Sequence, residues 1–395
     1  MKRALLGWEF GAGLEHVRRL TTIGLRLAEL GWEVSFALRE LNGAPDLLRL
    51  GFRVLQAPIP PSLVVGTERF RAGSYGEIIS SYGFGDEGVT TSVLAAWDEL
   101  IGLVDPQLII ADYSPFLSLA AYGRVALISI GDGFVMPPAH LDTFPLLHQG
   151  GTRPFDHAKA TQTINAVQKR RGGPPVRTLP SIVGGSAQIV CTFPELDAYR
   201  KLRRGTAAGP LKVQADPLPP PEHETIFFYL AADYQLTWRA LEAIAASGIK
   251  AKGFIRSGTP ERKRQFAEQG VFFYDKPPPI ADALAECSMI IHHGGVGTSE
   301  AALSAGRAQL LVPRHLEQTI NAKSLVNLGV AVVLASPFTL EAAKAAIEGL
   351  RTRTQARTRA QSVAALLAGR EKNKSLNLIA RAAEESLYRR AATAT

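Results

Sequence analysis

The sequence predicts an α/β protein built of two doubly wound parallel-sheet domains. Its 395 residues exceed what one hydrophobic core usually serves. In both halves, short apolar strands alternate with amphipathic helices, a pattern typical of sheets that helices cover on both faces. A proline-rich stretch separates the halves. We therefore expect Rossmann-like domains over 1–209 and 225–374, a linker over 210–224, and a helix over 375–395 that can pack back on the N-terminal domain.

The N-terminal half begins with a βαβ unit. Residues 4–8 form an apolar run, and Gly11-Ala12-Gly13 predicts a tight turn after it. Apolar residues then recur at three- and four-residue spacing from Val17 to Leu30, as in a helix. Alternation over 34–38 predicts the next strand. Two further apolar runs, 108–111 and 126–130, predict more strands of this sheet.

The C-terminal half repeats the alternation after the prolines. Pro217 and Pro219-Pro220-Pro221 predict a stiff, extended stretch. Strands are predicted after it over 226–230, 251–255, 288–291 and 309–312, with helices over 237–247 and 375–390. The second half is therefore a separate α/β domain.

The net charge and the cysteine content indicate which binding partners and which cellular compartment to expect. The net charge is +8, and the basic stretches suit an anionic partner or are simply solvated helix faces. They contain no nucleic-acid motif and no interleaved aromatic residues, so we expect no nucleic-acid partner. A contact with a membrane surface stays open but is not indicated. No apolar run reaches membrane-spanning length, and Cys191 and Cys287 are too few for a disulfide framework. We expect a cytoplasmic protein.

A glycine-rich turn in the second half has the layout of an anion site. The strand 288–291 leads into His292-His293-Gly294-Gly295-Val296-Gly297-Thr298, and a helix is expected over 299–305. Glycines let the backbone approach a ligand closely, and the N–H groups and dipole at a helix start favour negative charge. Hydroxyl side chains and a ring N–H of His293 can add donors. The segment predicts a phosphate site.

This segment resembles the donor motif of family 1 glycosyltransferases, especially the bacterial macrolide and sterol glycosyltransferases. The resemblance implies the two-domain GT-B fold, with two Rossmann-like domains facing a cleft, and a nucleotide sugar such as a UDP- or dTDP-sugar as donor. A weaker likeness spans Gly11 to Leu38. The matching segments are Cys287 to Thr298, Ala305-Gly306, Leu311-Val312-Pro313, Glu317-Gln318, Asn321-Ala322 and Leu328-Gly329-Val330.

By position, the resemblance implies roles for individual donor-site residues. Glu317 and Gln318 would bind the sugar hydroxyls, where the family usually has Asp-Gln, although they could instead form a solvated helix start. The residues that would hold the diphosphate are His293, Gly295, Val296, Gly297 and Thr298.

Three further segments depart from the family pattern. Ala301 stands where the family often has a ribose-binding glutamate, and Pro277 where it often has a tryptophan near the nucleobase. Ala231-Ala232 replaces a common Gly-Ser. These changes weaken the resemblance at the base and the ribose and leave the diphosphate site intact.

His16 and Asp112 are the candidates for catalysis. Inversion at the anomeric carbon needs a base for the acceptor hydroxyl, and a histidine that a carboxylate orients suits this task. His16 lies just after the first glycine turn, and Asp112 follows the strand 108–111, so both are expected at strand carboxyl ends. The resemblance pairs them as a dyad. Alternatively, His16 caps or packs its helix, and Asp112 caps the next helix or bonds Ser114 in a turn.

The acceptor is expected to bind loops of the N-terminal domain. Loops 59–86 and 137–155 are long and rich in aromatic and apolar residues, which suit a hydrophobic small molecule or result from ordinary loop packing. No metal-ligand motif is visible, so neither a metal nor another cofactor is expected. The aromatic and apolar residues of these loops are Phe70, Tyr75, Tyr82, Phe84, Phe144, Leu146 and Leu147.

The sequence thus predicts an inverting, metal-independent glycosyltransferase with a nucleotide-sugar donor and a small hydrophobic acceptor. Two alternatives remain at this stage. One is a glycosyltransferase of the same fold that acts on a lipid at a membrane surface. The other is a non-catalytic homologue that binds a nucleotide sugar or assists a partner enzyme.

Overall fold

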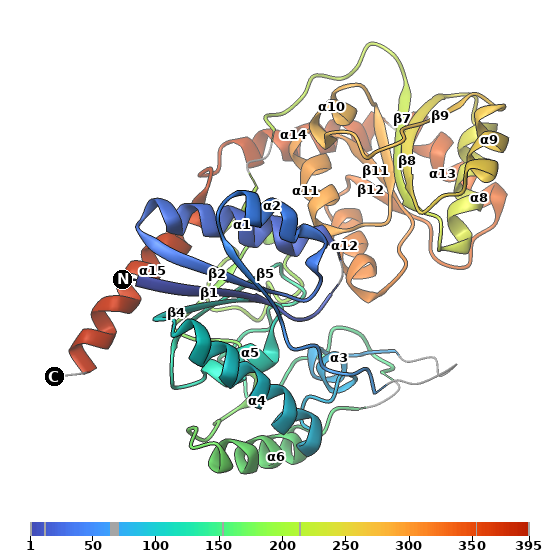
Figure 1. The fold of residues 1–395 in the computed structure, drawn as a ribbon. Helices are drawn as coiled ribbons and strands as arrows, with labels where there is room; N and C mark the ends of the chain where they lie inside the picture. The colour runs from blue at the N-terminus through green and yellow to red at the C-terminus, as the bar shows by residue number, and fades with distance from the viewer. Residues whose placement is uncertain are drawn as a thin grey trace. The chain divides into compact units, whose positions relative to one another are not determined.

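The computed structural model describes residues 2–11, 13–63, 71–151, 154–212, 215–352 and 354–393. The chain divides into two compact units, Met1–Lys212 with Asn373–Thr395, and Val213–Lys372. The sequence placed these boundaries after residues 209 and 374. Each unit contains one six-stranded parallel sheet between helices (Figure 1). Both halves therefore have the expected α/β architecture.

The sheet of the N-terminal unit has the order β3-β2-β1-β4-β5-β6. The chain order reverses between β1 and β4, which pair in parallel and so form the topological switch point, where open α/β sheets bind ligands at the strand carboxyl ends. The strands are β1 (Lys2–Trp8), β2 (Trp32–Leu38), β3 (Arg53–Gln56), β4 (Leu108–Asp112), β5 (Ala126–Gly131) and β6 (Ala187–Val190).

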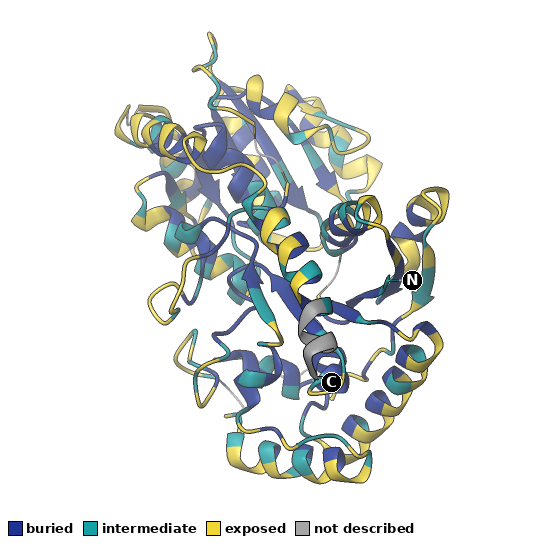
Figure 2. Ribbon diagram, turned by 90° about the vertical axis from the view of Figure 1, so that its left-hand side faces the viewer, coloured by how far each residue is buried: buried dark blue, intermediate teal, exposed yellow. Residues whose placement is uncertain are grey.

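Alternating side chains of the central strands enter two separate cores. Leu5 and Ile109 pack with helices α4 (Glu87–Val104) and α5 (Pro115–Ala121). Leu6 and Ile110 point to the opposite face, which α1 (Leu14–Glu29) and α15 (Lys374–Thr393) cover. Figure 2 shows the result as buried strands between helices whose outward sides are exposed. The other α-helices described here are α2 (Ala44–Arg49), α3 (Tyr75–Ser80), α6 (His157–Arg170) and α7 (Leu179–Ile182).

The C-terminal unit repeats the same strand order. Its sheet runs β12-β11-β10-β7-β8-β9, with the switch point between β7 and β10. The strands are β7 (Thr225–Ala231), β8 (Lys250–Arg256), β9 (Val271–Phe273), β10 (Met289–His292), β11 (Ala308–Leu311) and β12 (Ala331–Val333). The helices are α8 (Gln235–Ala246), α9 (Pro260–Ala267), α10 (Ile280–Ala285), α11 (Val296–Ser304), α12 (Leu316–Asn327), α13 (Leu340–Thr352) and α14 (Thr354–Ala368).

Part of the proline-rich stretch is fastened to the C-terminal unit. The buried guanidinium of Arg307 donates to the carbonyls of Leu218 (3.2 Å), Pro219 (2.8 Å) and Leu284 (2.8 Å). Gln361 donates a further hydrogen bond to Leu218 (3.1 Å). Because proline residues have no backbone N–H, side-chain donors such as these supply the hydrogen bonds that hold the stretch in place. Only a short part of the expected linker remains between the units.

The last helix, α15, belongs to the N-terminal unit. Ile379 and Ala383 are fully buried in the core that α1 also lines. Glu384 accepts hydrogen bonds from Lys2 Nζ (3.2 Å) and Trp32 Nε1 (2.9 Å), which tie the helix to the start of two strands. No helix in the described part of the chain is long and apolar enough to cross a membrane.

We expect α15 to contribute to the stability of the N-terminal unit. Ile379→Ala removes a fully buried side chain and should lower the free energy of unfolding by about 2 to 5 kcal/mol, as measured by urea denaturation. Its neighbour Leu378 is 38% exposed, so Leu378→Ala is the matched control and should cost much less. Equal losses for the two variants would contradict this packing.

Candidate active site

The two residues expected to form a catalytic dyad meet in the N-terminal unit. His16 lies in the first turn of α1, and Asp112 is the last residue of β4, across the switch point from β1. His16 Nδ1 lies 3.0 Å from Asp112 Oδ2. The Asp112 side chain is fully buried, and that of His16 is 13% exposed. The ring of His16 also stacks on Trp8, with centroids 5.0 Å apart and 13° between the planes.

The hydrogen bond fixes the tautomer of His16. An ionised carboxylate only accepts, so Nδ1 carries a proton, and in the neutral form of the ring Nε2 keeps a lone pair. Nε2 faces the loop after β1, where a Cβ at Gly11 would lie 2.7 Å from it. Gly11 has φ +81°, so the position favours glycine for its backbone as well as for the close approach of the ring. A basic nitrogen beside a glycine turn can accept a proton.

Arg19 is a third member of this cluster that the sequence analysis missed. It lies three residues after His16 on α1, and its Nη1 donates to Asp112 Oδ1 (2.7 Å). Burial alone would raise the pKa of the Asp112 carboxyl, but the charge of Arg19 and the contacts with His16 outweigh burial, so the pKa lies below its usual value. Helical i, i+3 spacing from His16 is the signal that could have revealed Arg19.

Glu9 is a second residue whose role the sequence did not reveal. It follows β1 directly, is fully buried, and accepts hydrogen bonds from the backbone N–H groups of Phe116 (2.9 Å) and Leu117 (2.8 Å) and from the Trp97 indole. Burial raises its pKa to about 8, despite these hydrogen bonds and the nearby charge of Arg39, which lower it. Glu9 therefore joins the start of α5 to the loop that leads to His16.

The glycine turn of the C-terminal unit lies at that unit's switch point. The turn follows β10, and α11 begins at Val296, three residues earlier than expected, with Gly295 as its N-cap. Val296, Gly297 and Thr298 thus form the first helical turn, whose N–H groups have no partner within the helix. Gly294 has φ +88°, and a Cβ there would lie 3.0 Å from the carbonyl oxygen of Gln318. The turn therefore favours glycine, and the start of α11 presents free N–H groups of the kind that can bind an anion.

His293 cannot donate to a phosphate in this arrangement, which corrects one expectation. Its Nε2 accepts from the N–H of Ala231 (2.9 Å), and its Nδ1 donates to the carbonyl of Val312 (2.7 Å). Both nitrogens of the neutral ring are thus used by backbone groups at the ends of β7 and β11. The sequence pattern could not show this because both partners come from other strands.

His292 is held in the opposite tautomer. Its Nδ1 accepts from the N–H of Gly294 (3.1 Å), so Nε2 donates to Gln309 Oε1 (2.9 Å). Burial lowers the pKa of His292 and of His293 to about 4. Both rings are therefore neutral supports of the turn, and positive charge for a ligand has to come from other residues.

Two arginines supply positive charge near this turn. Arg314 and Arg256 act electrostatically on His293 and add to the lowering of its pKa. Arg314 Nη2 also pairs with Asp233 Oδ2 (2.8 Å), and its backbone N–H donates to Gln318 Oε1 (2.9 Å). Gln318 is one of the expected sugar ligands, and its side-chain oxygen is thus already hydrogen-bonded to the backbone just before α12.

Glu317 and Asn321 also lie next to the turn. Glu317 is half-buried in the first turn of α12. Asn321 Nδ2 donates to the carbonyl of Gly294 (3.0 Å), which fastens α12 to the glycine turn. The segment 317–321 is therefore held beside the start of α11.

Most of the aromatic residues expected in acceptor loops are part of the core. Tyr75 and Phe144 are buried, with ring centroids 5.2 Å apart, and Phe84 packs on Phe116 at 5.1 Å. Packing rather than ligand binding explains these three side chains. Leu146 is exposed and Leu147 and Tyr82 are half-buried, while Phe70 lies outside the described residues.

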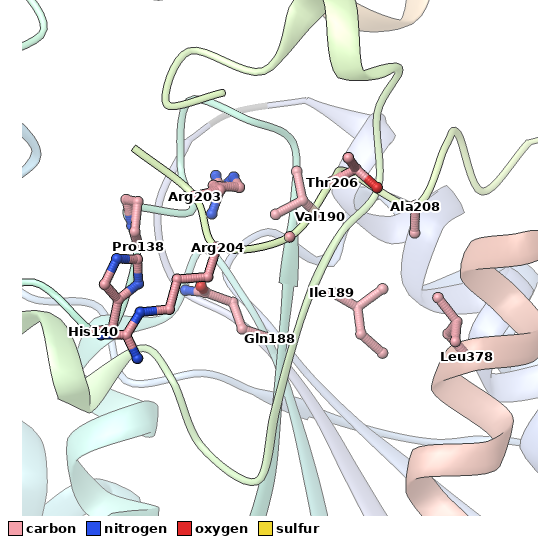
Figure 3. Close-up of a pocket in the computed structure, with 11 residues that line it drawn as sticks. Pro138, His140, Gln188, Ile189, Val190, Arg203, Arg204, Thr206, Ala208 and Leu378 are labelled. Atoms are coloured by element: carbon pink, nitrogen blue, oxygen red, sulfur yellow. The ribbon is translucent and has the colours of Figure 1, made fainter. Parts of the chain in front are cut away.

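A shallow pocket of about 210 Å³ lies beside the outer strand β6 of the N-terminal unit. Figure 3 shows His140, Arg204 and Gln188 on one side of it and Ile189 and Leu378 on the other. It contains neither His16 nor Asp112, so it is separate from the dyad. Across the described ranges, no three His, Cys, Asp or Glu side chains form a group that could hold a metal ion.

Comparison with known proteins finds a family match in the C-terminal half of the chain. Residues 276–374 match the family described as "Erythromycin biosynthesis protein CIII-like, C-terminal domain". The elloramycin glycosyltransferase ElmGT of Streptomyces olivaceus is 42% identical over 59 residues, 15% of each chain. Glycosyltransferase GtfC of Amycolatopsis orientalis is 32% identical over 123 residues, 31% of this chain and 29% of that relative. The matches thus span less than a third of these relatives.

The whole chain is similar in fold to solved glycosyltransferases. It aligns with VinC, solved in complex with DTDP, at a TM-score of 0.70 and 16% identity over 97% of this chain and all of that one. For the calicheamicin glycosyltransferase CalG4 the TM-score is 0.69 at 17% identity, over 98% and 99% of the two chains. The resemblance drawn from the sequence is confirmed: residues 276–374 match a macrolide-type glycosyltransferase family, and the whole chain has the GT-B fold of the solved glycosyltransferases.

The buried histidines predict a loss of stability in acid. Because the pKa of about 4 of His292 and His293 in the folded protein is below the ordinary histidine value of 6.5, the unfolded chain binds protons first as the pH falls. The free energy of unfolding should decrease from about pH 6.5 down to about pH 4. Urea denaturation across this range measures it.

A pair of matched variants locates this effect. His292→Gln removes one titrating ring and should lessen the decrease, whereas His140→Gln at an exposed loop of the other unit should not. Identical pH dependence of the two variants would show that His292 is not the cause.

Proposed function

We propose that this protein is an inverting glycosyltransferase that moves a sugar from a nucleotide-diphosphate sugar to a hydroxyl of a small, hydrophobic acceptor. The observation that carries the proposal is the pairing of His16 with a buried carboxylate at one switch point. An anion-binding helix start at the other switch point supports it. Both cysteines are free and buried, which agrees with a reducing cytoplasm.

His16 is the general base of this reaction. Its Nε2 removes the proton of the acceptor hydroxyl as that oxygen attacks the anomeric carbon. The bond between the anomeric carbon and the diphosphate oxygen breaks, and the electron pair leaves with the diphosphate. Attack from the opposite face inverts the carbon. Asp112 stabilises the imidazolium through the 3.0 Å contact with Nδ1.

The diphosphate is bound at the start of α11. In this proposal, the diphosphate accepts hydrogen bonds from the N–H groups of Val296, Gly297 and Thr298 and from the hydroxyl of Thr298. Gly295 leaves room for it, because a Cβ placed on this residue would have only its chain neighbours within 4 Å. Arg314 and Arg256 supply the positive charge that His293 lacks. Helix and arginines together can stabilise the leaving diphosphate without a metal.

The sugar and the acceptor are placed by neighbouring segments. Glu317 and the amide nitrogen of Gln318 would bind sugar hydroxyls. Tyr113, 6.3 Å from His16 between ring centroids, and the exposed Leu146 favour an apolar acceptor in the N-terminal unit. The relatives named for natural products such as elloramycin support an acceptor of this kind.

Donor binding is the first test. Nucleoside diphosphates and nucleotide sugars should raise the melting temperature, and the Kd from calorimetry should rise about tenfold or more in Arg314→Ala because a charge-assisted hydrogen bond is lost. Arg351→Ala is the control. Arg351 contacts Glu224, which lies just before β7 at the amino ends of the strands, whereas the glycine turn lies at their carboxyl ends. If none of the nucleotides stabilises the wild-type protein, the proposed donor site is wrong.

Sugar transfer is the second test. His16→Ala should lower kcat by about 10²- to 10⁴-fold, the usual contribution of a general base, and should leave the Kd for nucleoside diphosphate unchanged. Arg18→Ala, two residues along the same helix and exposed, should keep its activity. A lipid acceptor would require vesicles for turnover. Donor binding by wild type with neither hydrolysis nor transfer across a broad acceptor panel would identify a non-catalytic homologue.

A further inference from the structure

Arg19 lies at the centre of a small network of buried charges. Its side chain is 12% exposed, and its Nη1 binds Asp112 Oδ1 at 2.7 Å. Its Nη2 lies 3.9 Å from Oδ2 of Asp132, which follows β5. One guanidinium therefore lies between carboxylates that come from the ends of two neighbouring strands.

Both carboxylates are held in place independently of Arg19. Asp132 Oδ1 accepts from the N–H groups of Phe134 (2.9 Å) and Val135 (3.2 Å). Asp112 is anchored by β4 and contacts His16 through its second oxygen. Since neither acidic group can turn away to solvent, their negative charges need a nearby cation.

The charge balance of the network depends on whether His16 is protonated. With His16 neutral, two aspartates and one arginine leave a net charge of minus one, and protonation of His16 brings the network to neutrality. Without the guanidinium, the same site would hold two uncompensated carboxylates beside His16. Such a site would attract a proton to His16 before any acceptor arrived.

Few other groups can supply this compensation. Around His16, Trp8 is uncharged, and the ring of Tyr113, which carries a phenol, lies 6.3 Å away between centroids. The Cys191 thiol near Arg19 is neutral because burial raises its pKa to about 12. On α1, Glu15 and Arg18 pair with each other at 2.7 Å on the exposed side. Arg19 is therefore the cation that faces Asp112.

We propose that Arg19 is a positioning residue, which holds Asp112 ionised between itself and His16 and keeps His16 neutral, with its proton on Nδ1, until the acceptor binds. The inference rests on the proposed function of His16 as the base. It assigns Arg19 no contact with the donor or the acceptor. Arg19 acts only through Asp112 and the local charge.

The ionisation of His16 can be followed by NMR titration of its imidazole, which does not require turnover. Arg19→Met should raise the midpoint of His16 by about one pH unit or more, because a cation within the network is lost. Arg19→Lys keeps the charge and should remain near the wild-type midpoint. Arg18→Met removes the same charge from the preceding residue, which lies on the exposed side of α1, and should leave the midpoint of His16 unchanged.

The pH profile of transfer gives the second measurement. The ascending limb of kcat/KM should move to higher pH in Arg19→Met by the same amount as the NMR midpoint, and Arg19→Lys should restore it. An unchanged or lowered His16 midpoint in a folded Arg19→Met protein, with a circular dichroism spectrum like wild type, would overturn the inference. If wild type transfers no sugar, the proposed function fails, while the NMR midpoints still decide the part that Arg19 plays.

Discussion

Burial of both faces of each parallel sheet is the constraint on which the rest of this structure depends. Strands such as β1 and β10 are buried along most of their length because helices cover them on both sides. Polar groups can then reach a ligand only where the strands end. The reversal of strand order opens that edge between β1 and β4 and between β7 and β10. His16, Asp112 and the glycine turn all lie at these two places.

The same constraint explains which strands the sequence could predict. All the strands expected from apolar runs are inner strands of the two sheets, where continuous burial gives a strong signal. The strands that were missed, β3, β6, β9 and β12, are the four outer strands. Each is short and partly exposed, so its side chains show neither a long apolar run nor strict alternation.

The candidate site was predictable to a similar degree. The position of each residue relative to a strand end placed His16 near Asp112 and the start of α11 at the carboxyl end of β10. What the ring nitrogens of His293 bind depends on Ala231 and Val312, which come from other strands. Likewise, the sequence shows Arg19 only as an ordinary helix residue, because the two aspartates beside it come from the ends of β4 and β5. Long-range pairing of this kind leaves no local pattern.

The placement of α15 has a consequence for how the protein is made. The C-terminal unit is one continuous stretch of chain, whereas the N-terminal unit needs residues from both ends. During synthesis from the N-terminus, the C-terminal unit can therefore complete its core while part of the other core still lacks Ile379 and Ala383. The half of the protein that carries His16 is the last to be finished. Until then, the apolar face that α15 covers is open to chaperones and to other chains.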